Sequence, residues 1–370
     1  GRLRSSRLGK IMTKLLCLLA LLFVFSAQTF AQLSIQAIDA AGDSITKGFN
    51  ASRSFPCSNG DQEQYNWLTS DTHGATLCGT GSENVFSFRE RLECEFGIDI
   101  LAKNPNSAAS GARMLSDFVN QSNSIKTYLN SQTGQKLAAV FLGHNDNCAG
   151  TLGKVNVSCT SSDLDPNNYC RTKNDSFERE FRKGLDILVT TPNTKIGVMS
   201  PVRVSQLCNF QSKSNCQTGG TCQFLWSLAS ICASLTRDCT DTRIIDSYTT
   251  IKAYRDILKR VTAEYSSIPV GGTTTVLMIG GEMVGGATRA AGTNFVYSDA
   301  PWNYKFNADQ LSCCDCFHPS ASGQDTVARF AKQGLSCSKT APCCRETGDP
   351  LTDGKCAVTE KKRAFYNGIF

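Results

Sequence analysis

Residues 35–46 read IQAIDAAGDSIT, from Ile35 to Thr46. The first part is a short apolar run that predicts a buried strand, and Gly42 allows the backbone to turn tightly after it. Ser44 would then lie at the carboxyl end of a parallel strand, where open α/β sheets bind ligands. Alone, Gly42, Asp43 and Ser44 are also typical of an ordinary strand-to-helix turn in which Asp43 or Ser44 caps the helix.

Short apolar runs and helical patterns alternate beyond this first strand. The runs, which are often β-branched, predict buried strands at residues 35–41, 98–102, 137–142, 195–199 and 274–279. Between them, helical patterns occupy residues 85–96, 113–129, 176–189, 250–265 and 324–335. Alternation of this kind favours an α/β fold with a parallel sheet that helices cover on both faces.

One large domain accounts for most of the chain, and we place it at residues 32–336. Residues 51–81 and 208–239 are polar, cysteine-bearing and weakly periodic, which predicts disulfide-rich loop insertions on the α/β body. Residues 337–370 are rich in Cys, Gly and Pro and have too little apolar content for a core of their own. We therefore expect a disulfide-stapled C-terminal extension.

The N-terminus predicts export. Lys14 precedes an apolar run at residues 15–25, and the pattern Thr29-Phe30-Ala31 follows, as in a secretory signal peptide that ends at residue 31. Met12 is the expected natural start, which would leave residues 1–11 upstream of the protein. The run is too short to span a bilayer, and no later run approaches the required length. We expect a secreted, extracellular protein without a transmembrane segment.

The net charge comes mainly from the same segment. Residues 1–31 contain five Lys and Arg and no acidic residue, so without them the formal net charge falls from +6 to +1. A nucleic-acid-binding domain needs a basic stripe on its folded surface. The rest of the chain offers only the short run Lys361-Lys362-Arg363, which we interpret as a solvated tail. We therefore expect no nucleic-acid partner.

Cysteine usage agrees with export. Cys17 lies in the predicted signal peptide, and the other 18 of the 19 cysteines are spread from Cys57 to Cys356. An even number in an exported chain predicts a disulfide framework. Zinc is the alternative for the clusters at residues 313–316 and 337–356, but these lack paired C-x-x-C knuckles, so we expect no metal. Four sequons, at Asn50, Asn120, Asn156 and Asn174, would accept glycans in a eukaryotic host.

A second chemical signal follows the strand predicted at residues 137–142, where the chain continues as Gly143-His144-Asn145-Asp146. An Asn at this place can direct its amide toward the strand-end crevice, as an oxyanion-binding group does. Gly, Asn and Asp are also common turn formers. We expect Asp146 and His144 to shape the loop that carries Asn145, with substrate contact by His144 as the alternative.

A third signal, Asp315-Cys316-Phe317-His318-Pro319, precedes the last predicted helix. Serine hydrolysis needs a general base near neutral pKa, and that base needs a carboxylate to fix its tautomer. The chain has only three histidines, and His318 alone combines a nearby acid with a rigidifying proline. The alternative is a surface carboxylate beside a loop histidine.

Together these motifs resemble the sequence blocks of the SGNH (GDSL-type) hydrolases, in the right order and over residues 35–335. Gly42-Asp43-Ser44 matches the first block, Ser110-Gly111-Ala112-Arg113 the second, Gly143 to Asp146 the third, and Asp315 to His318 the fifth. The resemblance implies a three-layer α/β/α sandwich of flavodoxin-like type. It also implies Ser44 as nucleophile, Asp315 and His318 as its acid–base partners, and an oxyanion hole formed by the backbone N–H groups of Ser44 and Gly111 and the side chain of Asn145.

The implied function is a secreted serine ester hydrolase of lipase, phospholipase or esterase type that needs no cofactor. Its partner would be a small-molecule or lipid ester, with transient contact to a lipid surface if the substrate is a lipid. The high cysteine content is similar to that of the secreted phospholipase B-like and acyloxyacyl-hydrolase-like branches, and Ile45 stands where Leu is usual. One alternative is a carbohydrate acetyl esterase that uses the same site; another is a catalytically silent, disulfide-rich binding protein. Ser44 lies in no G-x-S-x-G motif, which disfavours the α/β-hydrolases.

Overall fold

The structure is a computed structural model that describes residues 35–52, 57, 59–70, 85–96, 100, 106–155, 157, 159 and 169–336. Contacts divide the chain into two units, Gly1–Ser34 and Ile35–Phe370, and every element described belongs to the second. The predicted signal peptide (residues 1–31, with residues 1–11 upstream of the start) and the predicted extension (residues 337–370) lie outside the described residues.

The second unit alternates strands and helices. In chain order the elements are β1 (Ile35–Gly42), η1 (Glu63–Tyr65), α2 (Phe88–Phe96), α3 (Phe118–Asn130), β2 (Gln135–Phe141), η2 (Asn145–Asn147), η3 (Leu152–Lys154), α4 (Asn174–Leu188), β3 (Thr194–Met199), η4 (Val204–Phe210), α5 (Cys222–Ala229), α6 (Ala233–Thr236), α7 (Asp241–Ser267), β4 (Leu277–Ile279), β5 (Glu282–Val284), β6 (Asn294–Ser298), α8 (Ala300–Asn303), η5 (Ala308–Gln310), α9 (Ala321–Ala331) and η6 (Lys332–Ser336).

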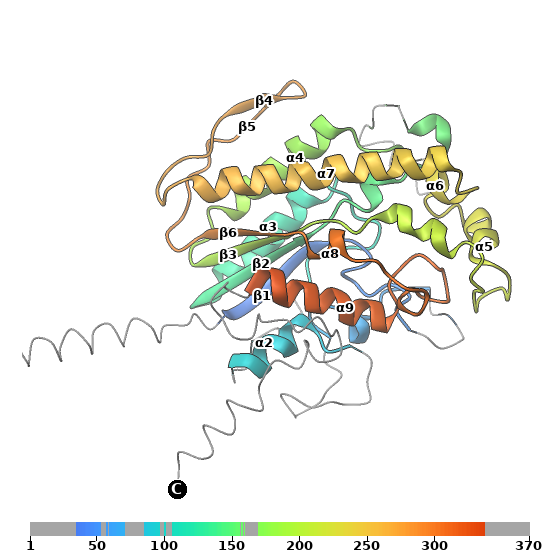
Figure 1. Cartoon of the computed structure of the whole chain (residues 1–370). Coiled ribbons are helices and arrows are strands. Elements are labelled where there is room, and N and C mark those ends of the chain that lie inside the picture. Colours follow the sequence, from blue (N-terminus) through green and yellow to red (C-terminus); the bar gives the residue numbers. More distant parts are fainter. Residues whose placement is uncertain are drawn as a thin grey trace, which may run out of the picture. The chain divides into compact units, whose positions relative to one another are not determined.

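The central sheet has the strand order β1-β2-β3-β6, and every neighbouring pair is parallel (Figure 1). Gly42 at the end of β1 pairs with Phe141 at the end of β2. Nearly every residue of β1, β2 and β3 is buried, as in a parallel sheet that is covered on both sides. The register therefore brings the residues that follow β1 and β2 to one edge of the sheet.

Helices cover both faces of this sheet, so the α/β class and the α/β/α layers are confirmed (Figure 1). Because successive side chains of a strand point to opposite faces, the strands supply two separate cores. One core joins alternate strand residues to α3, α4 and α7 and includes Ala37, Ala138, Val140, Ile196, Phe118, Phe181 and Tyr254. The other joins the remaining strand residues to α2 and α9 and includes Ile38, Ala139, Phe141, Phe88, Leu92, Val327 and Ala331.

The strand predicted at residues 274–279 is not part of the central sheet. Its last residues form β4, which pairs only with the antiparallel β5, and Met278 at its centre is 66% exposed. The fourth central strand is β6, which was not predicted from the sequence. Strand propensity records how well a segment fits a pleated surface and does not specify its partner. The strand predicted at residues 98–102 lies outside the described residues except for Ile100, which is buried but not in a strand.

The predicted insertions differ in how far the structure describes them. Residues 208–239 contain two short helices, α5 and α6, where only a loop was expected. Residues 51–81 lie partly outside the described residues. The helix predicted from residue 113 begins only at Phe118, because the backbone N–H groups of Met114 and Leu115 donate to the carboxylate of Asp146 instead. Within the described parts of the chain, no helix is both long and apolar enough to cross a membrane.

An acidic residue, Asp39, lies fully buried inside β1. Its carboxylate accepts hydrogen bonds from the backbone N–H of Ala40 at 2.7 Å, and from the backbone N–H and the hydroxyl of Ser107 at 2.9 and 2.7 Å. Burial raises the pKa of Asp39 to about 6, although these hydrogen bonds act to lower it. The carboxylate thus ties β1 to the loop that leads to Gly111.

We expect Asp39→Asn to stabilise the protein selectively near neutral pH. A carboxyl group with a raised folded-state pKa stabilises the fold fully below its unfolded pKa, and this contribution is lost as pH rises through the folded pKa. The rise from 3.8 to about 6 corresponds to about 3 kcal/mol, lost between about pH 4 and pH 6. Denaturant unfolding of both proteins at about pH 4 and about pH 7 measures this. The free energy of unfolding of Asp39→Asn should rise relative to that of the wild type between about pH 4 and about pH 7. An equal difference at both pH values would contradict the raised pKa of Asp39.

Candidate active site

The first site residue, Ser44, lies in the turn that follows β1. Gly42 has no room for a side chain there, because a Cβ would lie 2.1 Å from the Oγ1 of Thr46. The carbonyl of Asp43 accepts the N–H groups of Thr46 at 2.9 Å and Lys47 at 3.2 Å, which closes the turn. Ser44 is buried at 6% exposure, yet its Oγ reaches another part of the chain.

That partner is His318, on the loop before α9. The Nε2 of His318 lies 2.7 Å from the Oγ of Ser44, and its Nδ1 lies 2.7 Å from the Oδ2 of Asp315. The ring contacts the aromatic rings of Phe49 and Phe317, with centroids 4.9 and 5.1 Å away. The three residues grouped from the sequence therefore form one continuous line of hydrogen bonds, although Ser44 and His318 are 274 positions apart.

Asp315 is buried and accepts several hydrogen bonds. Its Oδ1 accepts the backbone N–H groups of Phe317 at 2.9 Å and His318 at 3.0 Å, and the Nδ2 of Asn50 donates to its Oδ2 at 2.7 Å. Burial alone would raise the pKa of Asp315, but the charge and hydrogen bond of His318, together with these N–H groups, hold that pKa below its usual value. The carboxylate is thus kept ionised beside the imidazole.

Asn50 is a supporting residue that stood out in the sequence only as a sequon. It is 3% exposed, has a left-handed backbone with φ of 53°, and receives at its carbonyl a hydrogen bond from the hydroxyl of Ser312 at 2.6 Å. Asn is among the side chains that tolerate this backbone region best. Because its Nδ2 is buried against Asp315, a glycan at this position does not fit the folded arrangement.

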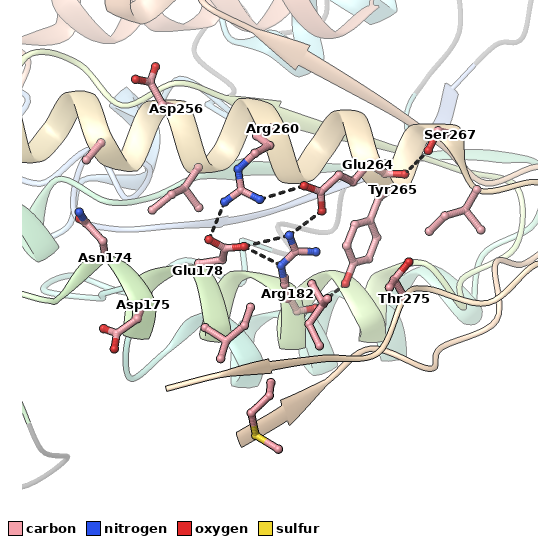
Figure 2. Close-up of a pocket in the computed structure, with 16 residues that line it drawn as sticks. Asn174, Asp175, Glu178, Arg182, Asp256, Arg260, Glu264, Tyr265, Ser267 and Thr275 are labelled. Carbon is pink, nitrogen blue, oxygen red and sulfur yellow. Dashed lines mark hydrogen bonds and ion pairs between the residues drawn. The ribbon is translucent and has the colours of Figure 1, made fainter. Parts of the chain in front are cut away.

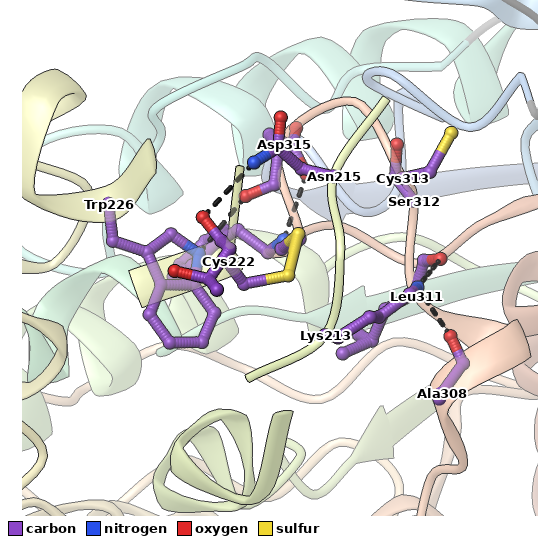
Figure 3. Close-up of a disulfide and its surroundings, with 12 residues drawn as sticks. Lys213, Asn215, Cys222, Trp226, Ala308, Leu311, Ser312, Cys313 and Asp315 are labelled. Carbon is purple, nitrogen blue, oxygen red and sulfur yellow. Dashed lines mark hydrogen bonds between the residues drawn. A yellow bond between two sulfur atoms is a disulfide. The ribbon is translucent and has the colours of Figure 1, made fainter. Parts of the chain in front are cut away.

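Three disulfides fasten the loop of Asp315 and His318, and Figure 3 shows the surroundings of the one that Cys222 forms. The pairs are Cys57–Cys314, Cys216–Cys313 and Cys222–Cys316. All three partners lie in the two predicted insertions and none lies in the C-terminal tail. Bridges of this kind were predicted from the cysteine content, and the described residues contain three more pairs, Cys148–Cys232, Cys159–Cys170 and Cys208–Cys239.

Hydrogen bonds add to this attachment. The Nε1 of Trp226 in α5 donates to the carbonyl of Asp315 at 3.0 Å, and the Nζ of Lys213 donates to the carbonyls of Ala308 and Leu311 at 2.6 and 2.9 Å (Figure 3). The insertion therefore packs directly beneath the loop, with the side chain of Trp226 fully buried. It is a structural support for Asp315 rather than a loose surface loop.

The loop that carries Gly111 lies between the ends of β1 and β2. The backbone N–H of Ala109 donates to the carbonyl of Gly42 at 3.2 Å, and the Nδ2 of Asn145 donates to the carbonyl of Ala112 at 3.0 Å. Gly111 itself has a φ of 79° and is exposed. Among the described residues, no acceptor takes the backbone N–H of Ser44 or of Gly111. An amide nitrogen has two hydrogens, so Asn145 also keeps one to donate.

Asp146 also holds the loop that carries Gly111. Its fully buried carboxylate accepts the backbone N–H of Met114 at 2.8 Å and the hydroxyl of Thr172 at 2.6 Å. Burial raises the pKa of Asp146, an effect that the nearby charge of Arg113 opposes. The Asp146 carboxylate therefore joins the loop after β2, which carries Asn145, to the loop that carries Gly111.

A second Asp–His pair lies under the site, and it was not predicted from the sequence. The Nδ1 of His144 is 2.7 Å from the Oδ2 of Asp43, while its Nε2 accepts the backbone N–H of Val202 at 3.1 Å. Both side chains are buried. Since both ring nitrogens have protein partners, His144 joins the turn of Ser44 to the segment after β3 and leaves neither nitrogen for proton transfer.

A family model described as GDSL-like Lipase/Acylhydrolase matches residues 38–330 of the sequence. This match covers well over half of the chain and includes Ser44, Gly111, Asn145, Asp315 and His318. The chain belongs to the GDSL-like lipase/acylhydrolase family. Its general activity is accordingly the hydrolysis of esters. No curated protein matches the sequence.

A cavity of about 990 Å³ in this GDSL-like hydrolase lies between α4, α7 and β4 and is lined by none of the motif residues of the family (Figure 2). Four of its charged side chains pair with one another: Glu178 pairs with Arg182 at 2.9 Å and with Arg260 at 2.5 Å, and Glu264 pairs with the same two arginines. Asp175 and Asp256 also line it. No His or Cys lines it. Its size therefore does not mark it as the site of ester hydrolysis.

One cluster of potential metal ligands occurs among the described residues of this GDSL-like hydrolase. The sulfur atoms of Cys57, Cys216 and Cys314 lie within 4.8 Å of one another. All three are in disulfides, to Cys314, Cys313 and Cys57 respectively. Metal binding needs thiolates, so this cluster does not fit a metal ion while the bridges are intact.

Proposed function

We propose that the chain is a secreted serine ester hydrolase in which Ser44, His318 and Asp315 act as a catalytic triad. The main observation in support is the line of hydrogen bonds from Ser44 Oγ through the ring of His318 to Asp315, with 2.7 Å at each step. In this arrangement His318 carries its proton on Nδ1, which donates to Asp315, so that Nε2 is free to accept the hydroxyl proton of Ser44.

The reaction would follow in two halves. Ser44 Oγ attacks the ester carbonyl carbon as His318 Nε2 takes its proton, and the negative oxygen accepts hydrogen bonds from the N–H groups of Ser44 and Gly111 and from Asn145 Nδ2. His318 then protonates the departing alcohol, leaving an acyl group on Ser44. A water molecule then attacks the acyl carbonyl carbon as His318 Nε2 takes its proton. The bond from that carbon to Ser44 Oγ breaks, which releases the acid, and His318 returns the proton to Oγ.

The disulfides support the secreted setting. Six bridges occur among the described residues, and such bridges persist in oxidising compartments and are rare in the cytosol. Export itself is tested by expressing the full chain in a secretory host and locating the protein in the medium with its N-terminal residue determined. Retention of residues 1–31 would contradict the signal peptide.

The catalytic assignment is tested by a screen against p-nitrophenyl esters, phospholipids and acetylated glycans, combined with fluorophosphonate labelling. We expect ester hydrolysis and covalent labelling at Ser44. Hydrolysis limited to acetylated glycans would favour the carbohydrate esterase. Absence of both hydrolysis and labelling in folded protein would favour the silent binding protein, and labelling at another serine would overturn the assignment of the nucleophile.

The Asn145→Ala variant should lower kcat by about 10² to 10³ with little change in KM, because the amide stabilises charge that develops only in the transition state. Its Nδ2 also holds Ala112 at 3.0 Å, so thermal unfolding should accompany the kinetics. An unchanged kcat in a folded variant would remove Asn145 from the oxyanion hole.

Removing the Cys222–Cys316 bridge should lower kcat before the protein unfolds globally. Proton transfer requires the site groups to be held within about half an ångström, and Cys316 lies next to Asp315. The double variant Cys222→Ser with Cys316→Ser is compared with Cys208→Ser and Cys239→Ser, whose bridge does not reach this loop. Each lost bridge typically costs about 2 to 5 kcal/mol. Equal kcat in the two double variants would show that the bridge contributes only stability.

A further inference from the structure

A small apolar cavity lies beside the proposed nucleophile. Its volume is about 50 Å³. It is lined by Ile45, His144, Val202, Arg203, Val204, Gln206, Leu207, Phe210, Phe306, Leu311, Phe317 and Pro319. Most of these side chains are aliphatic or aromatic, and they come from the turn after β1, from η4 and from the loop before α9.

The walls connect this cavity to the proposed reaction centre. Ile45 follows Ser44 directly, Phe317 and Pro319 flank His318, and His144 precedes Asn145. Ser44, His318 and Asn145 therefore each have an immediate chain neighbour in the wall, whereas Gly111 has none. The cavity therefore adjoins the chain segments that carry the proposed nucleophile and base.

The polar side chains in the wall are turned toward protein partners. Arg203 Nη2 and Gln206 Nε2 both donate to the carbonyl of Tyr304, at 3.2 and 3.1 Å, and both ring nitrogens of His144 are in use. Only the buried Nε of Arg203 lacks a hydrogen-bond partner among the described residues of this wall. A hydroxyl-rich sugar would lose its water contacts here with little replacement, whereas an alkyl chain would lose none.

The volume sets the length of that chain. One water-sized group needs about 10 to 15 Å³ measured in this way, so the cavity holds about four methylene or methyl groups. We propose that this cavity is the acyl-chain subsite of the enzyme and takes a linear aliphatic acyl group of about four to five carbons. This assignment rests on the proposed function. It makes short-chain aliphatic esters, rather than acetylated polysaccharides or long-chain lipids, the preferred substrates.

The test is a series of p-nitrophenyl acetate, butyrate, pentanoate and octanoate. Each buried methylene contributes about 0.8 kcal/mol, which is about fourfold in kcat/KM. The three methylenes that separate acetate from pentanoate should therefore raise kcat/KM about 60-fold, and octanoate should fall below pentanoate. A maximum at acetate, or a continuous rise to octanoate, would overturn the subsite.

Two variants locate the effect in the cavity. Val202→Phe narrows it and should lower kcat/KM for pentanoate about 60-fold, to near the level of acetate. Phe210→Ala widens it and should move the maximum toward octanoate, a gain that a damaged fold cannot produce. Phe224→Ala is the matched control, since Phe224 is 52% exposed on α5 and outside the cavity. An unchanged chain-length profile in both cavity variants overturns the subsite but leaves the proposed function intact; no hydrolysis of any ester by the wild type overturns both.

Discussion

Ser44→Ala is expected to lower the rate of ester hydrolysis by about 10⁶, the size of effect seen when a triad nucleophile is removed. Without Oγ no acyl-enzyme can form, and the oxyanion donors alone give only weak catalysis. The fold should survive, because an alanine at this position keeps the backbone of the turn, and Asp315 continues to hold His318 at 2.7 Å. One lost hydrogen bond costs about 1 kcal/mol.

The control for this variant is Ser227→Ala, on the exposed side of α5, whose hydroxyl donates to the carbonyl of Gln223 at 2.9 Å. It should keep wild-type kcat and wild-type labelling by a fluorophosphonate, both of which Ser44→Ala should lose. Hydrolysis by folded Ser44→Ala at more than about a hundredth of the wild-type rate would exclude Ser44 as the nucleophile.

The fold could be predicted from the sequence as far as its strands were buried and continuous. β1, β2 and β3 are mostly apolar and almost entirely buried, which gave their positions to within a few residues. β6 has the sequence NFVYS with an exposed Asn294, so it offered no comparable run. The run at residues 274–279 was more apolar, yet Leu277–Ile279 forms a half-exposed hairpin strand. β6 joins the sheet and packs against α7. The sequence of a short segment does not contain information on such tertiary contacts.

The site could be predicted where its residues follow strand ends or lie close together in the chain. Ser44 follows β1, and Asp315 and His318 are three positions apart, so both groups could be identified. Asn50 and Trp226 support Asp315 from 265 and 89 positions away, and no local pattern predicts those contacts.

The positions of Asp43 and His144 in the sequence contained an indication of their pairing that the sequence analysis did not use. Both residues come just after the ends of β1 and β2, and these strands are neighbours in the sheet. The strand order needed to join them could not be derived from the runs alone. Their pairing also shows that a nearby acid in the sequence was not a safe criterion for choosing among the three histidines.

Asp315→Asn should lower kcat by about 10⁴, the effect known for the corresponding change in another serine triad. The Asn Oδ1 would keep the N–H groups of Phe317 and His318, which now bond Asp315 Oδ1 at 2.9 and 3.0 Å. Its Nδ2 would then face His318 Nδ1, so the imidazole has to carry its proton on Nε2. In that tautomer Nε2 cannot accept the proton of Ser44.

This variant separates a role in proton transfer from a role in folding. Asp256→Asn, on the exposed face of α7 in an ion pair with Lys252 at 2.7 Å, is the matched control and should keep full activity. Asp315→Asn should still bind substrate with KM within a few-fold of the wild type and still place Ser44 for slow labelling. The variant changes the tautomer of His318 and loses the hydrogen bond that Asn50 Nδ2 donates to Asp315 Oδ2 at 2.7 Å, but it keeps the backbone hydrogen bonds that hold the loop. A loss in kcat matched by a collapse of the melting temperature would instead assign Asp315 to stability. A kcat within tenfold of the wild type would mean that His318 is oriented by the backbone and the disulfides around it, without the carboxylate.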